Sequence, residues 1–179
     1  MKCPCCKNAD LTPTMIEQNL PAMACSTCNG SLVSLLYYRH WAETQRPALD
    51  ADTAQVVVET NDTTAALHCP KCQRIMTKYR LTGNVANRLD VCARCDEVWL
   101  DKGEWELLES LQLNLKIAAV FTDTWQRRIR QQSSDEARRR TFVRVVGEED
   151  ARRVEEFRDW LNAHQHRPEI MAYLYLHRR

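Results

Sequence analysis

Glycine is scarce in this chain of 179 residues, which has only four, at Gly30, Gly83, Gly103 and Gly147. Their spacing allows neither a G-x-G-x-x-G nor a G-x-x-x-x-G-K loop, the two common backbone cradles for phosphate groups. The G-x-S-x-G, H-E-x-x-H and C-x-x-C-H motifs, which mark serine hydrolases, zinc peptidases and attached haem, are also absent. We therefore expect a protein that is not an enzyme and has no small-molecule substrate.

A surplus of charge and a long apolar run are missing as well. The chain has 25 Lys and Arg against 24 Asp and Glu, a formal net charge of +1, so no overall field attracts DNA or an anionic membrane. The longest nearly apolar run, Ile117 to Phe121, is far shorter than the ~20 residues of a membrane span. No apolar signal segment precedes the first cysteine motif at Cys3. These absences predict a soluble, cytoplasmic protein without membrane contact.

Cysteine, in contrast, is abundant, and all nine cysteines lie within the first 95 residues. Cys3-x2-Cys6 is followed after 18 residues by Cys25-x2-Cys28, and Cys69-x2-Cys72 is followed after 19 residues by Cys92-x2-Cys95. A two-residue spacer lets one tight turn aim both sulfurs at the same ion, and two such turns complete a tetrahedron. We therefore predict two Zn²⁺ ions, with the ligands Cys3, Cys6, Cys25, Cys28, Cys69, Cys72, Cys92 and Cys95.

Disulfides are the competing interpretation of these cysteines. The odd number, the absence of a secretion signal and the C-x2-C spacing all favour metal binding over disulfide bonds. Four thiolates can hold iron as well as zinc. A site with four cysteine ligands leaves no coordination position open for water or substrate, so we expect the ions to be structural rather than catalytic.

The two cysteine sets form an internal repeat with an offset of 66 residues. At this offset Pro4 aligns with Pro70, and Cys5 aligns with Lys71, which is not a ligand of the same kind. Cys5 is therefore predicted to be a spare thiol beside the first metal site. It is either a redox-sensitive residue or a neutral substitution in a reducing compartment.

The pattern along the chain predicts a small zinc-stabilised α+β protein, in which two four-cysteine zinc ribbons precede a mainly α-helical C-terminal domain. Strands are expected around Tyr79 and Leu89, and a short helix after Cys28. The predicted parts are residues 1–46 (first ribbon), 47–67 (an acidic linker with one edge strand at 56–58), 68–110 (second ribbon running into a helix) and 111–179 (an arginine-rich helical domain).

The C-terminal part has helical periodicity and recognisable helix starts. Asp101-x-x-Glu104 has the form of a capping box, and Ser133-x-x-Glu136 has a similar form. Apolar residues at three- and four-residue steps then predict helices over 102–116, 123–132, 133–146 and 148–163 and from Pro168 onward.

Arginine is concentrated in the middle of this helical part. Between Trp125 and Arg144 there are seven arginines against Asp135 and Glu136. A guanidinium fork suits phosphate oxygens, so one interpretation is a nucleic-acid-binding surface. The other is that the arginines pair with the acidic helix that follows. The seven candidates are Arg127, Arg128, Arg130, Arg138, Arg139, Arg140 and Arg144.

The second module resembles the bacterial family of small zinc ribbons named after transcription factor IIB. The resemblance rests on Cys69-Pro70-Lys71-Cys72, the strand pair, Cys92-x2-Cys95 and the segment Trp99-Leu100-Asp101-Lys102-Gly103-Glu104. The first module resembles the family more loosely, through Cys25-x2-Cys28-Asn29-Gly30. Asp96 and Glu97 replace a glycine pair that is usual in the family. The resemblance implies a zinc-stabilised ribbon fold and a link to transcription or nucleic acid.

Three functional hypotheses follow. The first is a non-catalytic protein, associated with transcription or RNA, whose arginines contact nucleic acid or a protein of the transcription or translation machinery. The second is a protein-interaction adaptor without direct nucleic-acid contact, which docks its partner on Asp96, Glu97, Trp99 and Trp105, helped by the cluster Tyr37, Tyr38 and Trp41. The third is a thiol or zinc redox switch centred on Cys5.

Overall fold

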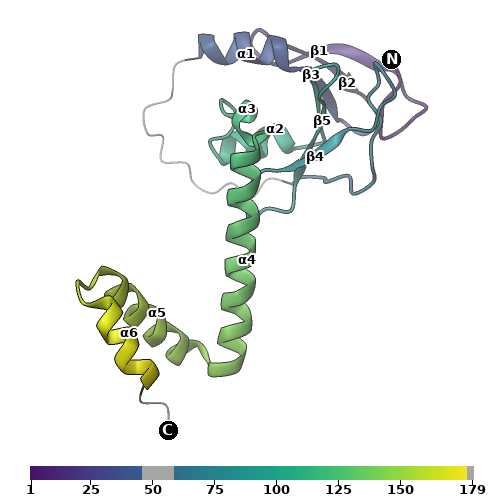
Figure 1. The fold of residues 1–179 in the computed structure, drawn as a ribbon. Coiled ribbons are helices and arrows are strands. Elements are labelled where there is room, and N and C mark those ends of the chain that lie inside the picture. Colours follow the sequence, from purple (N-terminus) through teal and green to yellow (C-terminus); the bar gives the residue numbers. More distant parts are fainter. Residues whose placement is uncertain (46–58, 177–179) are drawn as a thin grey trace. The chain divides into compact units, whose positions relative to one another are not determined.

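A computed structural model describes residues 1–45 and 59–176 of the chain. The fold comprises two compact units, Met1–Gln131 (unit 1) and Gln132–Arg179 (unit 2) (Figure 1). The predicted edge strand at 56–58, like most of the predicted acidic linker, lies outside the described residues.

The first ribbon consists of β1 (Leu11–Glu17), β2 (Leu20–Cys25), β3 (Ser31–Ser34) and α1 (Leu35–Thr44). Strands β1 and β2 form an antiparallel hairpin, and β2 pairs with β3 on its other side. The turn between β1 and β2 contains Asn19 in the left-handed conformation (φ 67°), which asparagine adopts more readily than most residues. The predicted helix after Cys28 is confirmed by α1.

The second ribbon repeats this arrangement. It consists of β4 (Thr77–Arg80), β5 (Arg88–Cys92), β6 (Glu97–Leu100) and α2 (Glu104–Ser110). Strand β5 is antiparallel to both β4 and β6, so the predicted strand pair around Tyr79 and Leu89 is confirmed.

The two ribbons join edge to edge into one six-stranded sheet with the order β1-β2-β3-β6-β5-β4. The joining strands β3 and β6 are antiparallel, with Ser31 opposite Leu100 and Ser34 opposite Glu97. Ser31 and Glu97 are equivalent in the 66-residue repeat, as are Ser34 and Leu100, so the pairing is reciprocal. The two copies therefore meet as two subunits do across a two-fold axis, although both belong to one chain. This pairing also protects one edge strand of each ribbon.

The sheet separates two apolar clusters because successive side chains of a strand point to opposite faces. Val33 and Val98 belong to the cluster that also contains buried residues of α1 and α2. Leu32 and Trp99, their neighbours on β3 and β6, belong to the cluster that contains the cysteines. Both metal-ligand sets are thus anchored in one apolar cluster, on the opposite side of the strands from the main core.

Unit 1 continues through α3 (Ile117–Val120) into the beginning of α4 (Asp123–Val146). The Ile117 N–H donates to Tyr38 Oη at 3.0 Å, and Trp125 Nε1 donates to Leu81 O at 3.0 Å. These contacts place the segment after residue 110 on the ribbon core. The predicted single helix over 102–116 is wrong, because α2 ends at Ser110 and is followed by Gln112 in the left-handed conformation (φ 55°).

The predicted helix boundary at Ser133 is also wrong, because α4 is continuous from Asp123 to Val146. No glycine or proline interrupts this stretch. The buried Ser133 hydroxyl has no hydrogen-bond partner among the described residues, so it does not act as a cap.

Unit 2 contains the rest of α4 together with α5 (Glu148–Ala163) and α6 (Arg167–Leu176). Gly147 (φ 86°) ends α4, and α5 begins at the next residue. Of the described residues of this unit, only Ala151 and Leu161 are fully buried hydrophobics. None of the described helices is both long and apolar enough to span a membrane.

Candidate metal centres

The four ligand cysteines of the first ribbon converge on one point. The sulfurs of Cys3, Cys6, Cys25 and Cys28 all lie within 4.8 Å of one another. Cys3 Sγ lies 3.6 Å from Cys28 Sγ, and Cys6 Sγ lies 3.9 Å from Cys25 Sγ. A tetrahedron with Zn–S bonds of ~2.3 Å has sulfur–sulfur edges of ~3.8 Å, so this spacing fits one Zn²⁺ ion.

The second ribbon has an equivalent cluster. The sulfurs of Cys69, Cys72, Cys92 and Cys95 also lie within 4.8 Å of one another, and Cys72 Sγ lies 3.6 Å from Cys92 Sγ. In both clusters the first and third cysteines are buried and the second and fourth are partly buried. The two four-cysteine groups therefore fit two structural zinc ions.

Each C-x2-C turn ends in a residue with left-handed backbone conformation. The residues directly after the second cysteines have φ values between 56° and 61°: Lys7, Asn29, Gln73 and Asp96. In three of the turns the N–H of this residue donates to the carbonyl of the first cysteine, as from Lys7 to Cys3 at 2.9 Å. Such a conformation favours glycine, and among other residues asparagine and aspartate. Asp96, in place of the family glycine, therefore leaves the turn intact.

The thiols of each cluster do not ionise alike in the absence of metal. Burial opposes ionisation of Cys25, but the N–H groups of Cys28 and Thr27 outweigh it and lower the pKa of that thiol to about 6. The N–H of Arg74 likewise lowers the pKa of Cys72 to about 7. Burial raises the pKa of Cys3 to about 11. One thiolate per cluster thus forms readily, and a bound cation is needed to hold all four together.

Cys5 lies beside the first cluster but is not one of its four ligands. Its sulfur is 3.6 Å from Thr63 Oγ1 and 3.6 Å from Asp101 Oδ1. Burial raises the pKa of the Cys5 thiol to about 12, and the nearby Asp101 carboxylate acts in the same direction. A protonated thiol is a poor nucleophile, so the surroundings of Cys5 disfavour a redox switch.

Trp99 lies in the cysteine-containing cluster and is only 1% exposed. Its Nε1 donates to Asp101 Oδ1 at 2.8 Å. A Cβ on Gly30 would lie 2.4 Å from the Trp99 ring, so a side chain there is incompatible with this packing. The predicted role of Trp99 in docking a partner is therefore wrong, because the ring fills the space beside the metal ligands.

The other predicted docking aromatics are core residues too. Trp105, Trp41 and Tyr38 are 7% exposed or less, and the Trp41 and Trp105 rings pack edge to face with centroids 5.5 Å apart. Of this predicted surface only Tyr37 is exposed. The structure thus contradicts an aromatic docking face on the ribbons.

The acidic pair Asp96 and Glu97 is paired within the fold. Glu97 is buried, and its carboxylate accepts from Lys71 Nζ at 2.5 Å. Arg39 of α1 makes a two-pronged ion pair with the partly exposed Asp96. The predicted use of these carboxylates in partner binding is therefore not supported at Glu97, and at Asp96 it would compete with Arg39.

Residues 59–67 pack on the second ribbon. The Thr63 N–H donates to Asp101 Oδ2, and the Asn61 N–H donates to Lys102 O at 3.0 Å. Leu67 is buried in the cysteine-containing cluster. The conformation of Gly103 (φ 80°) leaves room for this segment, since a Cβ there would lie 2.3 Å from Glu59 O. Residues 59–67 are thus part of the second ribbon, although the sequence predicts a linker.

The predicted capping box at Asp101 is only half present. Glu104 Oε2 accepts the Asp101 N–H at 2.9 Å, as expected. The Asp101 carboxylate, however, accepts from Trp99 and Thr63 and does not cap α2, whose N-cap is Gly103. The Trp-Leu-Asp-x-Gly-Glu segment therefore holds residues 59–63 and the Trp99 ring in place.

The predicted arginine surface is divided between the two units. Arg127, Arg128 and Arg130 belong to unit 1, and none of them forms an ion pair within the described part of the chain. The other four belong to unit 2, where Arg139 pairs with Glu148 and Glu155, both at 2.8 Å. Pairing with the acidic helix therefore accounts for Arg139.

Sequence analysis missed one cation beside these arginines, Arg80 at the end of β4. Gln126 Nε2 donates to Arg80 O at 2.9 Å, and the Arg80 N–H donates to Gln126 Oε1 at 3.3 Å. These two hydrogen bonds place the first turns of α4 beside the outer edge of the sheet. No pattern in the sequence connects two positions 46 residues apart.

Comparison with known proteins agrees with the geometry of the second ribbon. Residues 68–110 match the family model described as a transcription factor zinc-finger, the zinc ribbon of transcription factor IIB. No curated protein and no solved structure gives a significant match. The second cluster of four ligand cysteines, at Cys3, Cys6, Cys25 and Cys28, indicates tandem copies. The chain thus contains a zinc ribbon of the transcription factor IIB type at residues 68–110, preceded by a second ribbon with its own four-cysteine site.

Proposed function

We propose that this non-catalytic zinc-binding protein contacts nucleic acid through a basic surface of unit 1. The surface consists of Arg80 on β4 and Arg127, Arg128 and Arg130 on α4, and we call it the α4–β4 basic surface. The observation that carries the proposal is the pair of hydrogen bonds between Gln126 and Arg80, because it brings the arginines of the helix next to the one on the strand.

The positions on α4 support a common surface. Arg130 follows Gln126 by four residues, so the two side chains lie on the same face of the helix, one turn apart. Arg127 is adjacent to Gln126 in the sequence, and its Nε donates to Asp123 O at 3.3 Å, which leaves the rest of its guanidinium available.

Neighbouring cations differ from these four in being neutralised. Lys78 and Arg88 on β4 and β5 pair with Asp90 at 2.7 Å and with Asp62 at 2.9 Å. The α4–β4 basic surface has no such carboxylates in the described structure. Unpaired guanidinium groups suit phosphate oxygens, and a local cluster attracts a polyanion even when the net charge is near zero.

The test is the salt dependence of binding to labelled single-stranded RNA and duplex DNA, measured by fluorescence anisotropy. Replacing Arg127, Arg128 and Arg130 by Gln is expected to weaken binding. The slope of log affinity against log salt should become shallower by about 0.7–0.9 for each phosphate that the variant no longer neutralises.

The matched control replaces Arg152, Arg153 and Arg158, which pair with acids on α5, by Gln. It should leave both the affinity and the salt slope unchanged. Binding that ignores salt and the first variant would contradict the proposal.

Protein interaction is the second candidate function, and a different observation favours it. Unit 2 exposes several large apolar side chains, including Val145, Trp160 and Leu176. Purification from native cells with and without nuclease separates the two functions. Protein partners that remain in stoichiometric amount after nuclease treatment favour the adaptor, and partners that disappear favour the nucleic-acid role.

A further inference from the structure

We propose that unit 2 is a self-association module, whose apolar surface packs against the same surface of a second copy of this chain. The proposal is independent of nucleic-acid binding, because it concerns other residues in a different unit. Three observations support it: the small buried core of the unit, the position of its exposed apolar side chains and the charges of its helices.

Unit 2 buries too little to be stable as an isolated three-helix segment. Only Ala151 and Leu161 are fully buried hydrophobics in its described part, and α6 has no buried residue. Units of fewer than ~70–80 residues usually need disulfides, a metal ion or oligomerisation. No cysteine follows Cys95, and the described part of the unit has no cluster of metal-binding side chains. Oligomerisation is the remaining means of stabilisation.

The exposed apolar side chains follow the helices in regular steps. On α5, Val154, Phe157 and Trp160 recur every three residues, and the Phe157 and Trp160 rings lie 5.4 Å apart. Trp160, an aromatic typical of interface anchors, is 50% exposed. On α6 the exposed apolar side chains are Tyr173, Leu174, Tyr175 and Leu176.

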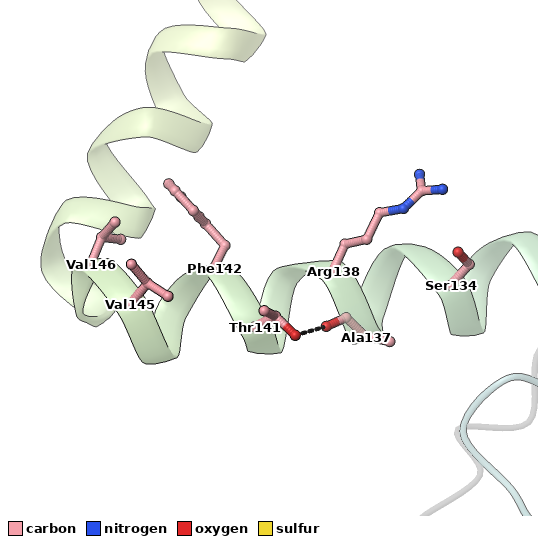
Figure 2. A pocket seen from close by; sticks show the side chains of 7 residues that line it. All are labelled: Ser134, Ala137, Arg138, Thr141, Phe142, Val145 and Val146. Carbon is pink, nitrogen blue, oxygen red and sulfur yellow. Dashed lines mark hydrogen bonds between the residues drawn. The ribbon is translucent and has the colours of Figure 1, made fainter.

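The C-terminal part of α4 provides a groove that such a side chain can enter. The groove has a volume of about 590 Å³, and Figure 2 shows Phe142, Val145 and Val146 at its apolar end. Arg138 and Ser134 lie toward the other end. Unit 2 thus carries both an apolar groove and a ridge of aromatic side chains, the two halves of a self-complementary surface.

The charges of the helices are complementary as well. The unit 2 part of α4 has four arginines against two acids, whereas α5 has six acids against three arginines. Arg139 makes the α4–α5 ion pairs within one chain. Arg140 and Arg144 form no ion pair in the described part of the unit. A two-fold arrangement that sets α4 of each copy beside α5 of the other provides carboxylates for them, so a second copy fits the surface better than an apolar partner.

The test is the molecular mass of the full-length, zinc-loaded protein, measured by sedimentation equilibrium over a wide range of protein concentration. We expect a reversible dimer of the wild type. The double variant Val145→Glu/Trp160→Glu should have the mass of one chain at the same concentrations. Its zinc content should be unchanged, because the cysteines belong to unit 1.

A matched control carries Leu36→Glu and Ile75→Glu, which alter side chains of unit 1 that are as exposed as those in unit 2. This control should remain a dimer. A wild type that is monomeric at every concentration would overturn the proposal, and the apolar surface would then be left for another protein. A double variant that still forms dimers would overturn it too, because the interface would lie elsewhere. Trp160→Phe, which keeps an aromatic anchor, should retain the dimer.

Discussion

The two units of this chain are stabilised in opposite ways. Unit 1 is built from short strands, and its order depends on two four-cysteine centres within one apolar cluster. Unit 2 has longer helices but almost no core of its own. The comparison teaches that secondary-structure length and tertiary stability are independent here, because a bound metal ion can replace the core that a strand of four residues cannot form.

Ion pairs follow the same division. In unit 1 they connect distant segments and include buried carboxylates, as in Lys78–Asp90, where the Asp90 side chain is 2% exposed. In unit 2 several link residues three or four positions apart on one exposed helix face, as in Arg152–Glu156. Exposed pairs of this kind contribute only a few tenths of a kcal/mol each. They support helices but do not specify a tertiary arrangement.

Removal of zinc is expected to have the largest effect and to act on unit 1 alone. Binding at structural zinc sites contributes roughly 10–16 kcal/mol in zinc-finger peptides, so a chelator should unfold the sheet. The near-ultraviolet circular dichroism of the packed rings, Trp41, Trp99 and Trp105, should disappear, while much of the helical signal of α5 and α6 remains. An unchanged near-ultraviolet spectrum after both ions have left would contradict a structural role of zinc.

Loss of a tryptophan should distinguish the two units next. Trp99→Ala removes a fully buried ring beside the metal ligands and should lower the free energy of unfolding of unit 1 by about 3–5 kcal/mol. Trp160→Ala removes a half-exposed ring of unit 2 and should leave the unfolding of unit 1 unchanged. Urea denaturation followed by near-ultraviolet circular dichroism measures both. Equal effects of the two changes would show that the units do not unfold separately.

Much of unit 1 is predictable from the sequence because its determinants are local. The two C-x2-C pairs of each ribbon identify the metal ligands, and alternation around Tyr79 and Leu89 identifies a strand pair. The packing of α4 on β4 is not predictable in this way, because it joins Gln126 to Arg80 through tertiary structure. The same holds for the pairing of β3 with β6, for which no sequence pattern exists.

Aromatic side chains show why the rest of the predicted site failed. Trp99 and Trp105 lie beside a metal motif, where an exposed docking role and a core role have the same sequence pattern. Only the packing decides between them, such as the approach of Trp99 to Gly30. The division of the arginines between two units has a similar cause, since α4 extends through the boundary and hides it from sequence periodicity.

The pH dependence of unit 1 should contain a contribution from Glu104, which is 1% exposed. Burial raises the pKa of its carboxyl to about 8, against hydrogen bonds from the Asp101 N–H and Asn87. The folded state therefore binds this proton more tightly than the unfolded chain, and its stabilisation is lost as the pH rises toward 8. Between pH 6 and 8 the loss should reach at most about 2–3 kcal/mol.

Glu104→Gln removes the titrating group but keeps an acceptor for the Asp101 N–H. The free energy of unfolding of the zinc-loaded variant should therefore fall less between pH 6 and 8 than that of the wild type. The wild type and the variant are compared by urea denaturation at each pH. Parallel curves would exclude Glu104 as the source of any pH dependence.

The smallest effect is expected for Cys5→Ser. Cys5 is not a ligand, so the variant should still bind two zinc ions per chain, with little change in stability. Zinc is measured by atomic emission after extensive dialysis. Release of one ion would assign Cys5 to the first centre, and Cys6→Ser provides the control in which that loss is expected.

X-ray absorption at the zinc edge of the purified full-length protein is the most direct test of the two four-cysteine centres. Two ions per chain, each with four sulfur neighbours at ~2.3 Å and no nitrogen or oxygen ligand, are the expected result. A single ion, or an average shell that contains oxygen or nitrogen, would contradict two closed structural centres and would leave a coordination position open for chemistry.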